Sequence, residues 1–454
     1  MLRFRQLTFG KYGHTLNRRQ SISPDGKWIV YDTRNEDSHI ARTHAIEMVT
    51  VDSGEIFRLY ETVQPTSAGP GVGAAAFHPS LHQIVFIHGL ECCNDAFPYS
   101  AARRFGAILK LQPDSSEAFR WIHAEARVVQ QSHPSFDSWG TLSGGTHAHS
   151  WNDLGWISFT YNDDLLESQS QTDRAIRDAR TVGFMLPRNG SLFSPSGTPE
   201  FGPIDGQNFD GSFFAYLAAT IHTRPSPGSD EISQAVEECW VGSKGYRKSD
   251  TAVPTLALAF QGSVVSDSGQ EFQEVFLCDL PDQANLLVAN GNVIQRATRM
   301  SDRLAPAAGC RQRRLTFTAG RSFPGIQGPR NWLVSSPSGD RLYFPMKDER
   351  AVVQLCCVAT ADGRLDQISE LATSIDSQIS LSQDGTRCAF LSDQRIVCID
   401  LATGISRIVT RRSDIESNRM QLAGAVQFLS NDRLVCNAYV GTGDERYLQV
   451  FIAQ

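Results

Sequence analysis

Residues 21–31 read SISPDGKWIVY, and the architecture of the chain can be worked out from this pattern. Two short apolar segments flank the turn Ser-Pro-Asp-Gly at residues 23–26. Pro presets φ for the turn and Gly tolerates a positive φ, so the chain reverses between two pleated segments. The pattern therefore predicts an antiparallel β-hairpin.

The same device recurs along the chain as an apolar segment, a polar turn and a second apolar segment. Clear copies lie at residues 77–87, 150–159, 336–344, 382–390 and 430–436, and a weaker copy joins 240–242 to 255–260 across an insertion. The shorter intervals between copies match the roughly 40 to 50 residues of a four-stranded blade. With the first hairpin, these copies predict an all-β chain folded as a seven-bladed β-propeller.

We expect a single domain over residues 1–454, with one blade for each hairpin. The blades are expected near residues 20–60, 73–122, 146–222, 237–318, 330–370, 377–410 and 423–454. The last repeat has room for only three strands, whereas residues 3–9 (RFRQLTF) form a strand with no hairpin of their own. Because closure of the ring leaves no long open edge, the N-terminal strand is predicted to complete the seventh blade.

The composition excludes some classes of function. Lys and Arg total 42 against 49 Asp and Glu, and the net charge of −7 comes without a basic block, which argues against nucleic-acid binding. The N-terminus lacks the apolar run of a signal peptide, and no stretch approaches the roughly 18 apolar residues of a membrane span, so a cytoplasmic location is expected. The ten cysteines include no CxxC pair, which disfavours a cysteine zinc site.

Strand directions alternate within a blade, so the loops between second and third strands share one face with the loops that join blades. The long predicted loops lie on this face, which we call the loop-rich face. Eight of the eleven histidines lie on or next to it: His14, His39, His44, His88, His123, His133, His147 and His149. Because functional residues concentrate on loops held by a rigid scaffold, we expect the active or binding site there. An ordinary polar loop surface is the alternative.

Residues 144–149 read GGTHAH and begin the predicted third inner strand. Strand alternation puts His147 and His149 on one side, about 7 Å apart along the backbone, and an inner strand faces the central channel. Two imidazoles at that spacing can share a divalent metal ion, and Mn, Ca and Zn are not distinguished. The pattern predicts a metal site at His147 and His149, with hydrogen-bonded strand histidines as the alternative.

Three residues are candidates for acid–base catalysis. His88 ends a strand beside Gly89, which permits close approach of another group. Tyr161 ends the second strand of the third blade. Glu237 follows a short helix predicted to start near residues 229–230, which would place its carboxylate at the channel mouth. A solvated helix end is the alternative for Glu237.

The candidates to contact a substrate share a place on the loop-rich face: His14, Arg103, Arg104, Asn162 and Asp163, with Arg174 and Arg177 as further arginines. Arginines in such loops suit a carboxylate or phosphate by bidentate contact. The alternatives are solubilising arginines on the surface and an Asp that only punctuates a turn.

Several segments together resemble the bacterial YidR-like family of β-propellers over nearly the whole chain. They are residues 86–89 (FIHG), 144–149 (GGTHAH), 158–163 (SFTYND), 227–232 (PGSDEI) and 313–318 (RRLTFT). More distantly, the Ser-Pro-Asp-Gly repeats resemble those of TolB-type propellers. The His-x-His inner strand is similar to the metal site of oligogalacturonate lyases, in which a Gln three residues earlier also binds the metal. Gly144 stands where that Gln would be.

These likenesses imply a carbohydrate-active enzyme. The expected activity is a metal-assisted lyase reaction on a small acidic sugar or oligosaccharide, with the divalent cation on His147 and His149 acidifying a C–H bond. The rival expectation is a non-catalytic TolB-like propeller that binds a protein or a cell-envelope partner. Fold alone supports both expectations equally.

Overall fold

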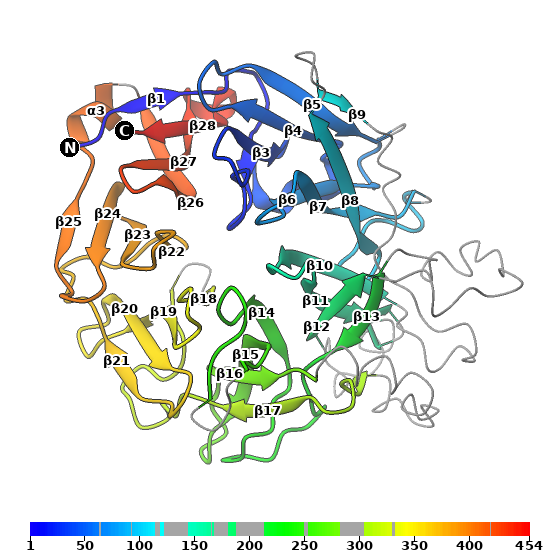
Figure 1. Ribbon diagram of the computed structural model, residues 1–454, viewed down its shortest axis with the longest axis vertical. Coiled ribbons are helices and arrows are strands. Elements are labelled where there is room, and N and C mark those ends of the chain that lie inside the picture. Colours follow the sequence, from blue (N-terminus) through cyan, green and yellow to red (C-terminus); the bar gives the residue numbers. More distant parts are fainter. Residues whose placement is uncertain are drawn as a thin grey trace, which may run out of the picture.

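The computed structural model describes residues 1–62, 65–91, 93–113, 119–121, 144–164, 166–167, 180–187, 213–248, 253–281, 304–328, 332–417 and 419–454. Its strands form seven antiparallel sheets of four strands each, arranged as a ring (Figure 1). The predicted seven-bladed β-propeller is therefore confirmed.

The four strands of each blade follow one another from the inner strand outward. Blade 1 holds β2 (Thr15–Leu16), β3 (Trp28–Asp32), β4 (Ala45–Thr50) and β5 (Ile56–Glu61). Blade 2 holds β6 (Val72–Phe77), β7 (Gln83–Gly89), β8 (Arg104–Pro113) and β9 (Phe119–Trp121). Blade 3 holds β10 (Gly144–Trp151), β11 (Ile157–Asp163), β12 (Thr181–Pro187) and β13 (Phe213–Leu217). Blade 4 holds β14 (Ala235–Trp240), β15 (Ala257–Val265), β16 (Glu271–Asp279) and β17 (Arg311–Arg314).

The inner strands of blades 5 and 6 have two residues each, like that of blade 1, whereas the inner strand of blade 7 has 11. Blade 5 holds β18 (Val334–Ser335), β19 (Arg341–Lys347), β20 (Val353–Ala359) and β21 (Leu365–Gln367). Blade 6 holds β22 (Ser380–Leu381), β23 (Arg387–Ser392), β24 (Arg395–Asp400) and β25 (Ser406–Ile408). Blade 7 holds β26 (Met420–Ser430), β27 (Arg433–Val440), β28 (Tyr447–Ala453) and β1 (Phe4–Gln6).

The N-terminal strand completes blade 7. β1 pairs antiparallel with β28, so that Phe4 lies opposite Ala453, and the two chain ends lie close together (Figure 1). The predicted closure is confirmed, and it pairs the outer edge of β28 that would otherwise be open.

The helices that accompany the strands are short in the described part of the chain. They include η1 (Asp37–Arg42), α3 (Arg412–Ser417) and η3 (Gly443–Glu445). Among the residues described, no helix has both the length and the apolar character to cross a membrane.

The hairpin turns take the geometry that their sequence predicts. In blade 1 the hydroxyl of Ser23 donates to Asp25 at 2.6 Å, the Gly26 amide donates to the Ser23 carbonyl at 2.9 Å, and Gly26 has φ +69°. In blade 6 the hydroxyl of Ser382 donates to Asp384 at 2.6 Å, and the glycine that follows has the same φ. Side-chain bonds of this kind favour the turn over continued strand.

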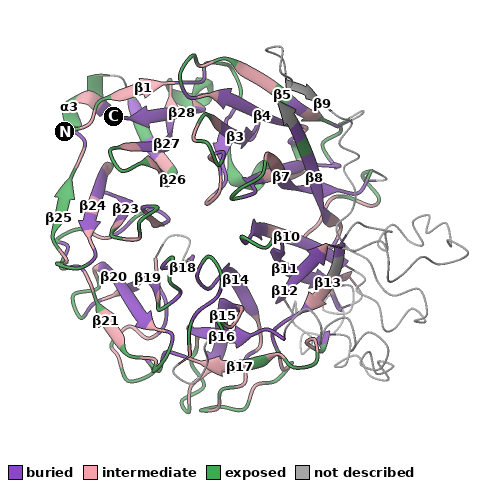
Figure 2. Ribbon diagram, viewed as in Figure 1, coloured by how far each residue is buried: buried purple, intermediate pink, exposed green. Residues whose placement is uncertain are grey.

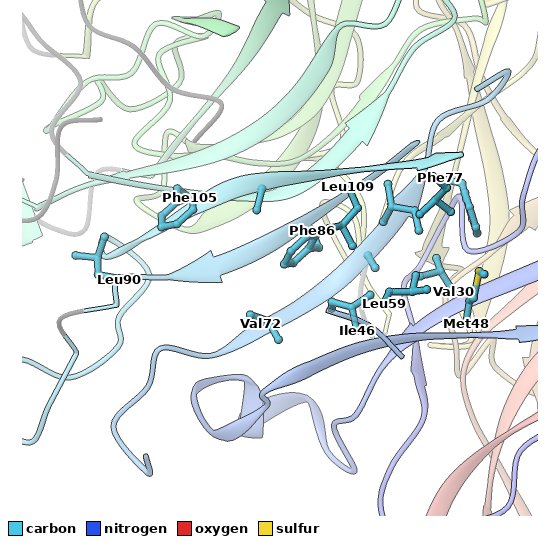
Figure 3. Close-up of a cluster of buried hydrophobic side chains, with 14 of the residues drawn as sticks. Val30, Ile46, Met48, Leu59, Val72, Phe77, Phe86, Leu90, Phe105 and Leu109 are labelled. Atoms are coloured by element: carbon cyan, nitrogen blue, oxygen red, sulfur yellow. The ribbon is translucent and has the colours of Figure 1, made fainter. Parts of the chain in front are cut away.

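The hydrophobic core lies between neighbouring blades rather than in the middle of the ring. Strands are buried along most of their length, and exposed residues gather in the turns and outer strands (Figure 2). Between blades 1 and 2, Val30 and Met48 pack with Phe86 and Leu109 in one cluster (Figure 3). A comparable cluster joins blade 7 to blade 1 through Tyr31 and other residues, so apolar packing also closes the ring.

Four inner strands carry a β-bulge where they border the channel. The pairing register shifts in β6, β10, β14 and β26. In each of these strands one shift contains a residue of positive φ, namely Ala74 (+54°), Ala148 (+59°), Glu237 (+57°) or Gly424 (+68°). A left-handed conformation costs a non-glycine residue on the order of 1–3 kcal/mol, so packing elsewhere must hold these bulges. The bulges also break the two-residue alternation on which the sequence prediction relied.

The helix predicted near residues 229–230 is absent, so that prediction was wrong. The hydroxyl of Ser229 donates to the Ser226 carbonyl at 2.6 Å and closes a turn. Backbone bonds to β15 then begin already at Ser233, whose amide donates to the Ser263 carbonyl at 2.9 Å. Because strand pairing starts this early, the segment has no room for a helical turn.

Candidate functional site

A cavity of about 720 Å³ lies at the centre of the ring. All seven blades contribute to its wall, through residues 15–19, 74, 147–149, 236–237, 332, 376–378 and 423–425. The loop at residues 34–38, Arg104 and Arg180 also line it, and these belong to the loop-rich face. The cavity is therefore the inner end of the channel on that face.

His147 and His149 both line this cavity, but they are held differently. The bulge at Ala148 lies between them, so simple strand alternation does not orient them. His149 is only 1% exposed, and its Nε2 lies 3.0 Å from the Thr146 hydroxyl. It also packs tightly on β8, because a Cβ added to Gly106 would come within 2.9 Å of that nitrogen.

Both imidazoles are neutral at ordinary pH. Burial lowers the pKa of His147 well below its ordinary value, and the charges of Arg104, Arg180, His149 and Arg18 lower it further. Burial, followed by the charge of Arg104, lowers the pKa of His149 to about 3. The Nδ1 atoms of both rings are buried without a hydrogen-bond partner. His149 is therefore buried and His147 is half-buried, and positive charge surrounds the pair.

The positive charge comes from three blades. Arg104 begins β8, Arg180 precedes β12, and Arg18 follows β2. All three line the cavity. A hydrogen bond of 2.9 Å from Nη1 of Arg104 to the Tyr99 hydroxyl fixes part of that guanidinium, while its Nε is buried without a hydrogen-bond partner. Guanidinium groups gathered in this way suit a carboxylate or phosphate.

Glu237 and Glu238 are neighbours in the β14 bulge, yet they face different surroundings. Glu237 lines the cavity with a 30% exposed side chain, and its Oε2 lies 3.2 Å from Nη1 of Arg18. Glu238 is fully buried and accepts a hydrogen bond of 2.6 Å from the Thr160 hydroxyl. Burial raises the pKa of Glu238 to about 7, against the lowering effect of Arg19. A strand bulge, not the predicted helix end, therefore presents Glu237 to the channel.

The floor of the cavity is built from Arg18, Arg19 and Trp332. The Arg18 guanidinium lies 3.1 Å from the centroid of the Trp332 ring, a cation–π contact. Nη2 of Arg19 donates to the Glu238 carbonyl at 2.7 Å. The same three residues line a second cavity of about 460 Å³ on the side of the tight turns. They therefore separate the two cavities within the channel.

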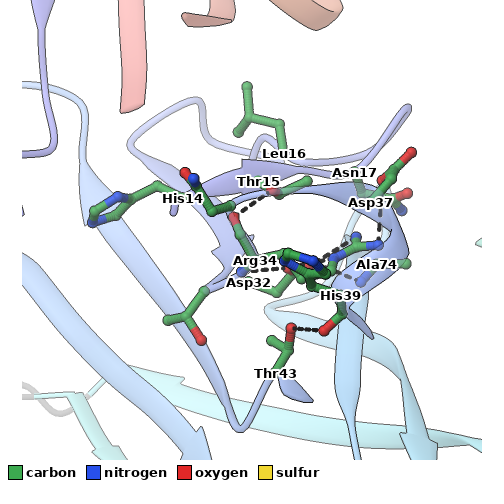
Figure 4. A network of polar contacts seen from close by, with 12 residues as sticks. His14, Thr15, Leu16, Asn17, Asp32, Arg34, Asp37, His39, Thr43 and Ala74 are labelled. Carbon is green, nitrogen blue, oxygen red and sulfur yellow. Dashed lines mark hydrogen bonds and ion pairs between the residues drawn. The ribbon is translucent and has the colours of Figure 1, made fainter. Parts of the chain in front are cut away.

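A buried ion pair supports the blade 1 side of the cavity (Figure 4). The Asp32 carboxylate is fully buried and accepts from Nε and Nη2 of Arg34 at 2.7 and 2.8 Å. Its Oδ2 also accepts from the backbone amide of Ala74 at 2.8 Å. Asp32 thus fixes the Arg34 guanidinium at the cavity wall and anchors the bulge of β6.

The surroundings of His147 and His149 do not fit a divalent cation. No group of three His, Cys, Asp or Glu side chains suited to a metal occurs in the part of the chain that the structure describes. Arg18, Arg104 and Arg180 share the cavity with the pair and would repel a cation. Metal ligands are ordinarily accompanied by anionic or carbonyl partners, whereas these imidazoles are accompanied by guanidinium groups.

His88 does not reach the cavity. It is 1% exposed, stacks on Phe105 with centroids 5.0 Å apart, and its Nε2 lies 2.7 Å from the Tyr60 hydroxyl. Burial lowers the pKa of His88 to about 4. Gly89 permits this close packing, as a Cβ there would meet the Pro70 carbonyl. Gly89, which suggested an accessible site beside His88, therefore allows tight packing of the chain where blades 1 and 2 meet.

The end of β11 also packs away from the channel. Tyr161 is fully buried in the cluster between blades 2 and 3, and its hydroxyl donates to Oδ2 of Asp163 at 3.0 Å. Oδ1 of Asp163 accepts from the Leu166 amide at 3.1 Å, as an aspartate that ends a strand does. Asn162 is 1% exposed. None of the three lines either described cavity.

His14 and Arg103 lie outside the cavity as well. His14 is fully buried, stacks on Tyr12 with centroids 4.5 Å apart, and its ring points away from the Asp32–Arg34 pair (Figure 4). Arg103 lies 3.9 Å from the Phe97 ring centroid on the outer loop. Of the predicted residues, the structure gathers His147, His149, Arg104 and Glu237 at the cavity. His123, His133, Arg174 and Arg177 lie outside the described residues.

Sequence reasoning missed Arg18, Arg180 and Trp332. Arg18 stands directly before the first hairpin, where the repeat places an inner strand, and a charged residue at that position is a usable signal for the channel. Arg180 and Trp332 precede strands at ordinary loop positions, and no local pattern distinguishes them.

Comparison with known proteins gives a relative in sequence and distant likenesses in structure. Residues 71–196 match a family described as "Protein of unknown function (DUF3748)". The chain is 31% identical over 407 residues to the "Uncharacterized protein YidR" of Escherichia coli (strain K12). The aligned region covers 88% of this chain and 87% of that protein. An oligogalacturonate lyase in complex with manganese is similar with a TM-score of 0.52 at 9% identity, covering 99% of this chain and 92% of that chain.

A second solved structure, TolB from Acinetobacter baumannii, has a TM-score of 0.35 at 13% identity, covering 84% of this chain and 62% of that chain. At 9% identity, the likeness to the oligogalacturonate lyase concerns the fold alone.

Proposed function

This chain belongs to the family of the YidR protein, and from that premise we propose that it binds a small carboxylate-bearing sugar in its central cavity and cleaves it as a lyase. The observation that carries the proposal is the convergence of Arg18, Arg104 and Arg180 around His147 on the cavity wall. Glu237 offsets one of these three charges, so an excess of positive charge remains around His147 for an anionic ligand; Glu36, Asp37 and Asp376 line other parts of the cavity.

The proposed reaction is a β-elimination on a uronate linked through its C4 oxygen. A base removes the proton from the carbon next to the carboxylate, the electron pair forms the C4–C5 double bond, and the C4–O bond breaks. The departing oxygen takes a proton from water in the open cavity. Negative charge grows on the carboxylate during proton removal, and fixed guanidinium groups stabilise it there.

His147 is the proposed base. Its lowered pKa keeps the imidazole unprotonated and able to accept the proton at neutral pH. A bound carboxylate would offset the charges of Arg104 and Arg180, which would raise the pKa of His147 towards its ordinary value and strengthen it as a base. The arginines supply the positive charge that a metal ion would supply in a metal-assisted lyase, so the scheme requires none.

The binding test compares D-galacturonate with D-galactose by isothermal titration calorimetry, since the two sugars differ in the carboxylate. We expect galacturonate to bind, and Arg104→Ala to weaken it about tenfold to a hundredfold, as for loss of a charge-assisted hydrogen bond. Arg103→Ala is the matched control, because this neighbouring arginine lies outside the cavity. Equal binding of the two sugars, or an equal loss in both variants, would refute the anion site.

The turnover test uses a short oligogalacturonate and follows the ultraviolet absorbance of the new conjugated double bond. His147→Ala should abolish product formation while it retains galacturonate binding. Binding without any turnover by the unaltered protein would reject the lyase reaction and leave the anion site standing. Docking of a protein partner on the loop-rich face stays a prediction, and no cluster among the described residues of that face supports it in particular.

A further inference from the structure

Glu237 is an unusual residue to find in a site for anions. It lines the cavity, it is ion-paired with Arg18 at 3.2 Å, and it stands among the guanidinium groups of Arg18 and Arg180. Its backbone φ of +57° is a value that residues other than Gly, Asn and Asp rarely adopt. Strained conformations persist where the surrounding structure holds them, and they concentrate at functional sites.

The bulge determines where this carboxylate points. β14 pairs with β15 on both sides of the irregularity, with Val236 opposite Gln261 and Cys239 opposite Ala259. Two residues, Glu237 and Glu238, therefore share the space of one. Glu238 is directed into the interface with blade 3, and Glu237 is directed to the cavity. In a regular strand Glu237 would face the side of the sheet opposite to Glu238. The extra residue takes Glu237 out of the regular ladder, and its carboxylate lies at the cavity beside Arg18.

The partner of Glu237 is itself held in place. The Arg18 guanidinium lies over the Trp332 ring at 3.1 Å, so the ion pair has a rigid cationic side. Both side chains of the pair keep some contact with the cavity, since Arg18 is 28% and Glu237 is 30% exposed. An incoming carboxylate could thus reach Arg18 from the cavity and take the place of Glu237.

We propose that Glu237 is an internal carboxylate that occupies the Arg18 side of the anion site and must yield when an acidic ligand binds, which makes it a selectivity residue. The inference rests on the proposed function, because it takes the cavity to be an anion site. A ligand whose carboxylate contacts Arg18 alone competes poorly with Glu237. A ligand that also contacts Arg104 and Arg180 displaces Glu237 from Arg18. Glu237 therefore favours ligands whose carboxylate is presented within a larger, well-oriented molecule.

The test measures galacturonate affinity of the full-length chain by calorimetry. Glu237→Gln removes the competing charge at nearly constant shape, and we expect affinity to rise about fivefold, the upper range for a partly exposed ion pair. Affinity for D-galactose should not rise, because that sugar has no carboxylate. Glu237→Gly removes the same carboxylate and accepts φ +57°, so it supplies a second measurement if the Gln variant folds poorly.

Glu61→Gln is the matched control, since Glu61 is a half-exposed carboxylate that is ion-paired with Arg58 at 3.0 Å and lines neither described cavity. Galacturonate affinity should change less than about twofold in this variant. Unchanged or weaker binding in Glu237→Gln, or an equal gain in Glu61→Gln, overturns the competition. If the unaltered protein binds galacturonate and Glu237→Gln does not improve it, only this inference fails. If no variant binds galacturonate, the proposed function fails with it.

Discussion

Replacement of Asp32 by Asn should lower the free energy of unfolding by about 3–5 kcal/mol, the cost of removing one partner from a buried ion pair. The Asp32 side chain is closed to solvent, and the paired Arg34 side chain is only 8% exposed. The carboxylate accepts three hydrogen bonds of 2.7 to 2.8 Å, two from the Arg34 guanidinium and one from the amide of Ala74.

The magnitude follows from what Asn can replace. Its carbonyl oxygen can replace only one of the two carboxylate oxygens. The NH₂ group then faces either Nη2 of Arg34 and the Ala74 amide, or Nε and the backbone amide of Arg34, so two donors lose their acceptor. Each hydrogen bond to a charged group contributes about 1.5–3 kcal/mol. The Arg34 guanidinium also keeps a second carboxylate partner, Asp37, at 3.3 Å. Because Asp37 remains, we expect the loss to stay near that of one broken buried pair.

Urea unfolding followed by tryptophan fluorescence measures this loss as a lower midpoint. Asp52→Asn, a change at an exposed aspartate in a turn of the same blade, should alter stability by less than about 0.5 kcal/mol. A loss below about 1 kcal/mol for Asp32→Asn would mean that the pair behaves like an exposed ion pair, and the argument from burial would be wrong. Weaker galacturonate binding should accompany the loss, because the same carboxylate positions Arg34 on the cavity wall.

Two further predictions concern pH and packing. The pKa of Glu238 is raised to about 7 in the fold against an ordinary 4.5, so its stabilising contribution is greatest at low pH and is lost as pH rises through 7. Between pH 4.5 and 8, the free energy of unfolding of Glu238→Gln should therefore rise by about 3 kcal/mol relative to that of the unaltered protein. Equal urea midpoints for the two proteins at both pH values would contradict this. Phe86→Ala should cost about 3–5 kcal/mol in urea because the ring is fully buried between blades 1 and 2. Phe9→Ala, at a 69% exposed ring, should cost less than about 0.5 kcal/mol, and a similar loss in both variants would show that burial is not the cause.

The amino-acid sequence determined the architecture because the information for it is local and repeated. The Ser-Pro-Asp-Gly turn at residues 23–26 and its copies specify hairpins within a few residues, and their number specifies the number of blades. The unpaired strand near residues 3–9 needed a partner, and the incomplete last blade offered one. Neither inference required knowledge of distances between remote residues.

Only the tertiary structure decided which side chains share the cavity. His147 and Glu237 line the cavity because their strands have bulges. The positive φ values in these bulges could not be predicted from residue type, since they belong to Ala148 and Glu237, which are not glycines. Arg18, Arg104 and Arg180 come from blades 1, 2 and 3, and only the packing of these blades around the channel brings their charges near His147. His88 looked equally suitable on its strand, yet the neighbouring blade buries it. Strand periodicity fixes the side of a sheet on which a residue lies, whereas the surroundings of that side depend on the packing of blades far apart in sequence.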